Sequence, residues 1–335
     1  MKVIKVPYNV YTLKGNAGFL TPSAAGIDPK IENEVICDPI QGNVSDCFFL
    51  AALGSCAWNT TSLAPTIPIK PGNFAASFDI PFWFNGALQK TTVSNKLFLG
   101  ANGMPVYAQP TLQNEIWVAI YEKAFAKFKG CPLDPEGNPD ISQLPWGSGL
   151  DALVNLTNKK YSFTAPLPQT AFATINAPPS PFNGQTCQDY YDIIKTVCTS
   201  NAASPSSGKT NKPMVAWTYD SEPLEWKNKG FLYRYPTTNL DRMLAAKHTY
   251  SILGYYTSGG NKYIVLRDPL GKWGTKSPQE DPVIKSYLPP APSNWDPVQD
   301  HQKFPNRDIS PCLYGLFGLR VDAFKGCFSG FGWVQ

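Results

Sequence analysis

The segment Cys47–Trp58 (CFFLAALGSCAW) constrains the fold more than any other part of this 335-residue chain. It carries no charged residue and is apolar on nearly every side of a helix, so that no face of such a helix favours water. We therefore predict a buried helix here, with Asp46 as its N-cap. A chain of this length has enough residues to surround it.

A second, amphipathic helix is predicted over Asn114–Lys129 (NEIWVAIYEKAFAKFK), with Asn114 as its cap and Gly130 as its stop. Its apolar stripe consists of Ile116, Trp117, Ile120, Ala124 and Phe128. The first half of the chain is accordingly interpreted as helical.

The second half is predicted to be rich in strands. Thr249–Tyr256 and Lys262–Arg267 are β-branched and aromatic, and the turn sequence TSGGN joins them into a hairpin. Helices followed by a sheet indicate an α+β fold. Ala165–Thr186, rich in proline and small polar residues, is the predicted boundary, which gives domains 1–165 and 166–335. Ser200–Pro213 is interpreted as a flexible loop and Leu288–Pro297 as a proline-rich connection.

Composition excludes several classes of protein. The net charge is only +4 and no Lys/Arg stripe carries interleaved aromatics, so we expect no nucleic-acid partner. No apolar run approaches the roughly 20 residues of a membrane span, and Met1–Lys14 does not resemble a signal peptide. The cysteines show no CxxC pair, which argues against a structural zinc site and favours a reducing, intracellular compartment. They are Cys37, Cys47, Cys56, Cys131, Cys187, Cys198, Cys312 and Cys327.

The chain has two histidines, so a Cys/His enzyme would take its base from one of them. His301 lies in a polar segment and is interpreted as a solvated loop residue. His248 precedes the first strand of the hairpin, and the midpoint of positions 248 and 268 is Ser258, inside the turn. We therefore predict that His248 faces Asp268 across the strands, with Cβ atoms about 5 to 7 Å apart. A carboxylate there would orient the imidazole; the alternative is a polar pair without a catalytic role.

Cys47 begins the apolar helix, where unpaired N–H groups and the positive end of the helix dipole favour a thiolate. The alternative is an inert buried cysteine. Gln41 lies six residues earlier, in QGNVSDC, where its amide could donate a hydrogen bond to a developing oxyanion.

These motifs together resemble the calpain family of cysteine proteases. QGNVSDCFFLAALGS is similar to the motif around the family's nucleophile, and HTYSILGYYTSGGNKYIVLRDPLGKWG to the motif around its histidine. NEIWVAIYEKAFAKFKGC resembles the helix between them, and LFGLRVDAFKGCFSGFGW the closing strand–helix–strand. The resemblance runs from about Ile31 to Trp333.

The resemblance implies a papain-like core of two lobes, a helical one with the cysteine and a β-rich one with the histidine. It implies an endopeptidase in which Cys47, His248 and Asp268 form the triad and Gln41 supports the oxyanion. Asp268 stands where the family has Asn, which should favour the imidazolium more strongly. Ser45, Phe48 and Leu270 replace a Gly and two Trp residues, which affects the fit of the substrate more than the chemistry.

The family also implies calcium sites in acidic loops. Asp38 stands where one ligand would lie, and Glu280 and Asp281 are the nearest candidates for a second site; ordinary solvated carboxylates are the alternative. We expect no required cofactor and weak or absent calcium dependence.

Two other functions stay open. A transglutaminase-type acyltransferase would also use Cys, His and Asp, although Ser-Asp before Cys47 and Pro-Leu-Gly after Asp268 match the calpain motifs better. A non-catalytic binding protein of the same fold would have no chemical need for Cys47, His248 and Gln41 together. The partner is expected to be a protein or peptide substrate, and the oligomeric state is left open.

Overall fold

A computed structural model describes residues 9–12, 39–42, 44–59, 77–94, 96–99, 106–108, 117–164, 186–201, 204–219, 232–233, 244–271 and 315–335. Its helices are α2 (Cys47–Trp58), α3 (Trp117–Phe128), the short 3-10 helix η1 (Ile141–Gln143), α4 (Gly149–Thr157), α5 (Cys187–Thr196) and α7 (Val321–Cys327). Its strands in the first half are β1 (Asn9–Thr12), β2 (Ser77–Phe84), β3 (Ala87–Ser94), β4 (Lys96–Leu99) and β5 (Tyr161–Thr164). Those in the second half are β6 (Cys198–Asn201), β7 (Ser204–Thr210), β8 (Met214–Thr218), β9 (Leu232–Tyr233), β10 (Leu244–Ala245), β11 (Thr249–Ser258), β12 (Asn261–Arg267), β13 (Leu316–Arg320) and β14 (Phe328–Val334).

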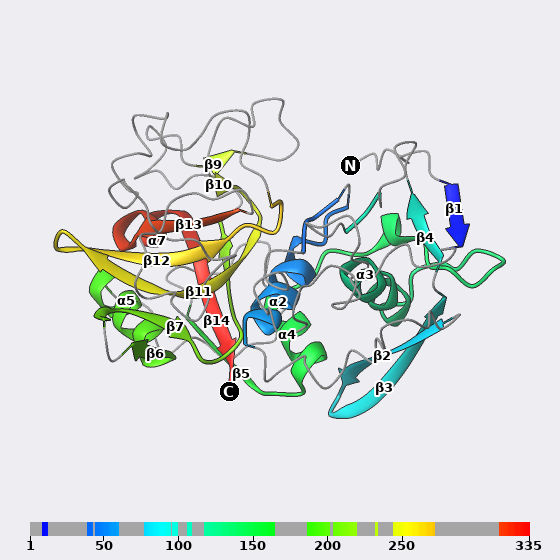
Figure 1. Ribbon diagram of the computed structural model, residues 1–335, viewed down its shortest axis with the longest axis horizontal. Helices are drawn as coiled ribbons and strands as arrows, with labels where there is room; N and C mark the ends of the chain where they lie inside the picture. The colour runs from blue at the N-terminus through cyan, green and yellow to red at the C-terminus, as the bar shows by residue number, and fades with distance from the viewer. Residues whose placement is uncertain are drawn as a thin grey trace, which may run out of the picture.

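Helix α2 has the predicted bounds, and all of its residues are buried. It lies in the middle of the molecule, between the large sheet on one side and α3 with the β2–β3 hairpin on the other (Figure 1). Asp46 occupies the N-cap position, but its side chain makes no capping hydrogen bond, so the predicted capping role is wrong. Its backbone carbonyl instead accepts from the N–H groups of Phe49 and Leu50.

The largest sheet has eight strands, all paired antiparallel. Six follow the order β13-β12-β11-β8-β14-β5, and β7 pairs with both β11 and β6. Strands β8 and β7 pair with successive parts of the same edge of β11. Its first residues, Thr249–Ser251, pair with β8, and residues 254–256 pair with β7. The start of β11, next to His248, is therefore held by its pairing with β8.

Side chains of β8 show that this sheet is covered on both faces. Val215 and Trp217 belong to one apolar cluster, built mainly by α2, α3, α4 and the β2–β3 hairpin. Met214 and Ala216 belong to a second cluster, with residues of α5, α7 and β14. Successive strand residues point to opposite faces, so the two clusters lie on opposite sides of β8.

Polar side chains fasten α2 to the sheet. Ser55 Oγ donates to the carbonyl of Met214 at 2.9 Å and accepts from its N–H at 2.6 Å. Ser251 Oγ on β11 donates to the carbonyl of Ala51 at 2.7 Å, and the indole N–H of Trp58 donates to the carbonyl of Leu253 at 3.0 Å. These bonds leave α2 little freedom to slide along the sheet, because each has a defined direction as well as a distance.

The second half is strand-rich as predicted, and the predicted hairpin is present as β11 and β12 around the turn Gly259–Gly260. The closing strand–helix–strand is also confirmed, as β13, α7 and β14. The flexible-loop interpretation of Ser200–Pro213 is wrong, since most of it forms the end of β6 and all of β7. Pairing of β7 with β11 supplies backbone hydrogen bonds that its small polar side chains gave no reason to expect.

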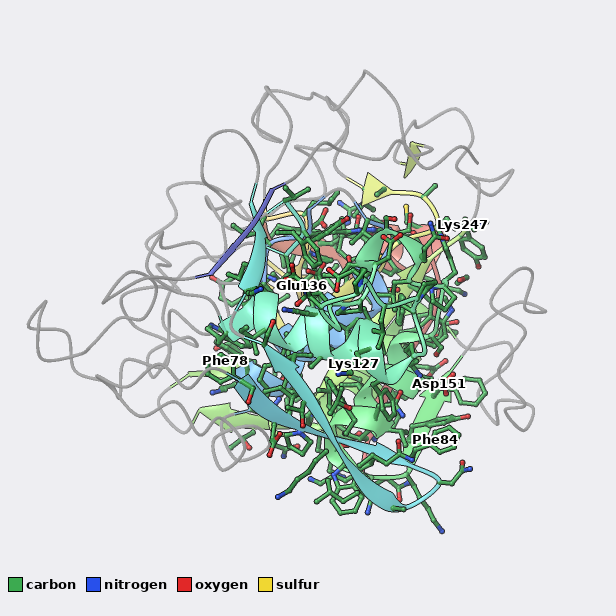
Figure 2. All side chains as sticks on the ribbon, turned by 90° about the vertical axis from the view of Figure 1, so that its right-hand side faces the viewer. Phe78, Phe84, Lys127, Glu136, Asp151 and Lys247 are labelled. Atoms are coloured by element: carbon green, nitrogen blue, oxygen red, sulfur yellow. The ribbon has the colours of Figure 1, made fainter. Side chains whose placement is uncertain are left out.

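The first half is less purely helical than predicted, because it also contains β1–β5. The largest departure is the hairpin of β2 and β3, joined by Asn85 and Gly86 with positive φ angles of 49° and 79°. Figure 2 shows this hairpin beside α3, with Phe84 and Lys127 labelled. Lys127 Nζ donates to the carbonyl of Thr92 on β3 at 2.8 Å.

Helix α3 is confirmed over Trp117–Phe128, with Gly130 past its end at φ 78°. Asn114 and Ile116 lie outside the described residues. None of the helices within the described ranges is both long and apolar enough to cross a lipid bilayer.

We predict that Ser55→Ala lowers the free energy of unfolding by about 1–3 kcal/mol, because it leaves a buried N–H group on Met214 without its partner. Chemical denaturation would measure this change. Ser77→Ala, at an exposed position of β2, is the matched control and should leave the midpoint nearly unchanged. A midpoint equally unaffected in both variants would contradict the structural role of Ser55.

Candidate active site

His248 and Asp268 form a buried hydrogen-bonded pair. The imidazole Nε2 lies 2.8 Å from Asp268 Oδ1, and the two residues are 6% and 2% exposed. The predicted contact between these side chains is therefore present. Because Nε2 is engaged by the carboxylate, Nδ1 is the ring nitrogen left for another partner.

The predicted strand register behind this contact is wrong by two residues. The turn is centred between Gly259 and Gly260, and an irregularity follows Ile252, so that Ser251 pairs with Arg267. Continuing that register would set Tyr250, not His248, opposite Asp268. His248 and Asp268 meet diagonally, which keeps both on the same face because the displacement is an even number of residues.

Backbone contacts hold both residues in place. The Thr218 hydroxyl accepts from the N–H of His248 at 3.1 Å, and the Thr218 N–H donates to the His248 carbonyl at 3.0 Å. Asp268 Oδ1 also accepts from the N–H of Leu270 at 2.9 Å, and the Asp268 N–H donates to the carbonyl of Gly315 at 2.8 Å. The N–H of Leu270 therefore orients the Asp268 carboxylate toward the imidazole.

Cys47 is the third member of this group. It is the first residue of α2, is 6% exposed and forms a hydrogen bond with the His248 side chain. Burial lowers the pKa of His248, but the negative charges of Cys47 and Asp268 and their hydrogen bonds outweigh it and raise this pKa to about 10. The arrangement therefore favours a protonated imidazole between Cys47 and Asp268.

Gln41 lies in the loop before α2, half-buried. Its backbone N–H donates to the carbonyl of Pro269 at 2.7 Å, which ties this loop to the turn that follows Asp268. Its side-chain Nε2 donates to the carbonyl of Val44 at 2.5 Å. An amide nitrogen carries two hydrogens, so one donor remains after the bond to Val44.

The segment Trp146–Gly149 borders the site and was missing from the sequence prediction. A Cβ atom on Gly147 would lie 2.6 Å from the Phe48 ring, and one on Gly149 would lie 3.0 Å from Thr249. The segment therefore packs against the residues that follow Cys47 and His248. The glycines of Trp-Gly-Ser-Gly were the available signal for this close approach.

Lys247, at φ 57°, places its ammonium 4.7 Å from the Trp146 ring and is labelled in Figure 2.

Several predicted candidates lie outside the described residues: Asp38, Glu280, Asp281 and His301. Within the described ranges, no group of three or more His, Cys, Asp or Glu side chains could hold a metal ion. The cysteines described are all free thiols, namely Cys47, Cys56, Cys131, Cys187, Cys198 and Cys327.

Residues 27–283 match the sequence model of a family described as "Calpain family cysteine protease". The match includes Gln41, Cys47, His248 and Asp268, and it confirms the resemblance drawn from the motifs.

Known proteins similar to this chain carry related names. It is 26% identical over 301 residues to a "Thiol protease" of Porphyromonas gingivalis (strain ATCC BAA-308 / W83), covering 86% of this chain and 53% of that protein. It is 30% identical over 123 residues to "Calpain-14" of Homo sapiens, covering 36% of this chain and 18% of that protein. It is 32% identical over 126 residues to "Calpain-5" of Mus musculus, covering 35% of this chain and 18% of that protein. The chain thus spans about half of the first relative and under a fifth of these calpains.

We predict that His248 stays protonated from its ordinary pKa of 6.5 up to about 10, and that Cys47→Ala lowers its pKa because burial is then opposed by one charge fewer. In the wild type, His248 adds to the free energy of unfolding fully below pH 6.5, and this contribution is lost as the pH rises through about 10. Nuclear magnetic resonance of the two imidazoles would measure the pKa of His248 in the wild type and in Cys47→Ala. The variant His301→Asn would assign the signals. A wild-type His248 that titrates below its ordinary pKa would contradict the charge pairing.

Proposed function

Since the chain belongs to the calpain family of cysteine proteases, we propose that it is an endopeptidase with a Cys47–His248–Asp268 triad and Gln41 as an oxyanion donor. One observation carries this proposal. The buried Nε2–Oδ1 contact of 2.8 Å orients an imidazole that is hydrogen-bonded to a cysteine at the start of a helix. Nucleophile, base and orienting carboxylate are the three parts that covalent peptide hydrolysis requires.

In the proposed reaction, the Cys47 thiolate attacks the carbonyl carbon of the scissile peptide bond. The resulting oxyanion accepts hydrogen bonds from the Cys47 N–H and from the free N–H of Gln41 Nε2. The His248 imidazolium gives its proton to the leaving amine as the C–N bond breaks, which leaves a thioester on Cys47. Water, deprotonated by the neutral imidazole, then hydrolyses the thioester and restores the thiolate–imidazolium pair. Asp268 keeps its hydrogen bond to the imidazole ring and stabilises the imidazolium.

We also propose a two-lobed, papain-like arrangement for this core, with lobes 1–165 and 166–335 and an extended peptide bound between them. The separate apolar clusters on the two sides of β8 support this division. Strand β5 (Tyr161–Thr164) lies within residues 1–165 but pairs with β14 of the second range. One strand of the first range therefore belongs to the sheet of the second.

We propose that hydrolysis needs no bound cofactor and that its dependence on calcium is weak or absent, since Cys47, His248 and Asp268 themselves supply the nucleophile, the base and the orienting carboxylate. The calcium candidates Asp38, Glu280 and Asp281 lie outside the described residues.

We predict that the wild-type protein cleaves a broad peptide mixture supplied with a primary amine, and that Cys47→Ala abolishes cleavage because the nucleophile is lost. Mass spectrometry would identify the products. Cys187→Ala, which removes a half-buried thiol of α5, is the matched control and should cleave as the wild type does.

The same assay separates the alternatives. Intact peptides that gain the amine and lose ammonia would instead indicate a transglutaminase-type transfer. Intact peptides without added amine, with and without calcium, would favour a non-catalytic binding protein. Cleavage that a chelator stops and calcium restores would contradict the proposal that no cofactor is needed.

We predict that Gln41→Ala lowers kcat by about 10²–10³-fold, the usual cost of losing one oxyanion donor, with a smaller change in KM. Steady-state kinetics on a peptide identified above would measure both constants. Gln89→Ala, on the exposed face of β3, is the control and should behave as the wild type. A rise in KM with kcat unchanged would show that Gln41 contributes to substrate binding and not to the transition state.

A further inference from the structure

Two buried carboxyl groups face each other directly behind the nucleophile. Asp46, which precedes Cys47, and Glu122 on α3 are both fully buried, and each acts on the pKa of the other. Both oxygens of Asp46 and Oε1 of Glu122 are buried without a hydrogen-bond donor among the described residues. Two ionised carboxylates would repel strongly at this distance in a site without water, so at least one proton is needed between them.

No side-chain cation neutralises this pair from α3. The neighbouring ammonium, Lys123 Nζ, donates to the Ser94 hydroxyl, to the carbonyls of Ser94 and Lys96 and to Asn138 Oδ1, at 2.6 to 3.1 Å. The charged group outside the pair that acts on Asp46 is the His248 imidazolium, which lowers its pKa. The protonation of the pair is thus linked electrostatically to the proposed catalytic groups.

Glu122 also supports the loop that carries Gln41. Its Oε2 accepts from the N–H of Ala108 at 2.8 Å. The preceding residue, Tyr107, lies so close to Gly42 that a Cβ atom there would be 2.2 Å from the Tyr107 carbonyl oxygen. Glu122 therefore links two parts of the site. It acts on Asp46, which precedes Cys47, and it binds the Tyr107–Ala108 segment, which packs against Gly42.

We infer that Asp46 and Glu122 share a proton, and that through this hydrogen bond Glu122 acts as a positioning residue for Cys47 and Gln41. This inference rests on the proposed function, because it concerns the geometry of the same nucleophile and oxyanion donor. The shared proton holds the start of α2 against α3. When the last proton leaves, two buried negative charges separate the carboxyl groups, and the nucleophile loses its support.

The pH dependence follows from the same contacts. Burial raises the pKa of Asp46 to about 7, and burial together with the Asp46 charge raises the pKa of Glu122 well above its ordinary range. The folded chain thus holds protons that the unfolded chain releases near 3.8 and 4.5. The free energy of unfolding therefore falls as the pH rises from these values toward and beyond about 7.

Glu122→Gln and Glu122→Leu separate a shared proton from simple packing. The amide of E122Q can accept from Ala108 and donate to Asp46 at any pH, whereas E122L can do neither. Infrared spectroscopy at neutral pH should show the carbonyl band of a protonated carboxylic acid in the wild type, weakened in E122Q. The fall of unfolding free energy with pH should be shallower in E122Q. Glu136→Gln, at an exposed surface ion pair, is the control and should match the wild type.

Reactivity then tests positioning. The rate at which a thiol-directed epoxide labels Cys47, and kcat for peptide hydrolysis, should fall on the alkaline side in the wild type but less so in E122Q. In E122L, kcat should fall by about 10²-fold, the scale of a displacement of about 1 Å. Identical pH profiles in wild type and E122Q, or an unchanged infrared band, would overturn the inference. If the wild type cleaves no peptide, the proposed function fails, while the infrared band and labelling profile still decide this inference.

Discussion

The docking of α2 on the antiparallel sheet is the contact on which the rest of the structure depends. Because this helix is apolar on all sides, it is stable only when the sheet and the helices α3 and α4 cover it. Apolar burial alone would allow sliding and rotation. The directional bonds from Ser55, Ser251 and Trp58 remove that freedom and so fix Cys47, at the end of the helix, relative to β11.

The candidate site consists of the ends of elements, not of their middles. Cys47 begins α2, His248 lies just before β11 and Asp268 just after β12. At these positions the backbone leaves its regular hydrogen-bonding pattern, so side chains from different elements can converge. The cost of the irregular backbone is offset by bonds such as those of Thr218 with His248 and of Gly315 with Asp268.

Buried charge is concentrated around this convergence. Cys47 and Asp268 raise the pKa of His248, whereas burial without a paired ammonium or guanidinium group among the described residues raises the pKa values of Asp46 and Glu122. Removing one partner from such a group would leave an unpaired charge in an apolar interior. The charges of the proposed triad and the proton inferred between Asp46 and Glu122 are for this reason parts of one electrostatic system.

The amino-acid pattern alone determined α2, α3, the β11–β12 hairpin and the identity of the chemical groups, because apolar periodicity and turn residues act over a few neighbouring positions. The β2–β3 hairpin had a local signal as well, Asn85-Gly86, which was overlooked. Tertiary structure decided what depends on residues distant in sequence: the strand pairing of Ser204–Thr210, the register that places His248, and the burial of the Asp46 side chain without a capping hydrogen bond. Local patterns cannot specify these features, since each is set by which distant surface supplies the hydrogen bond or the repelling charge.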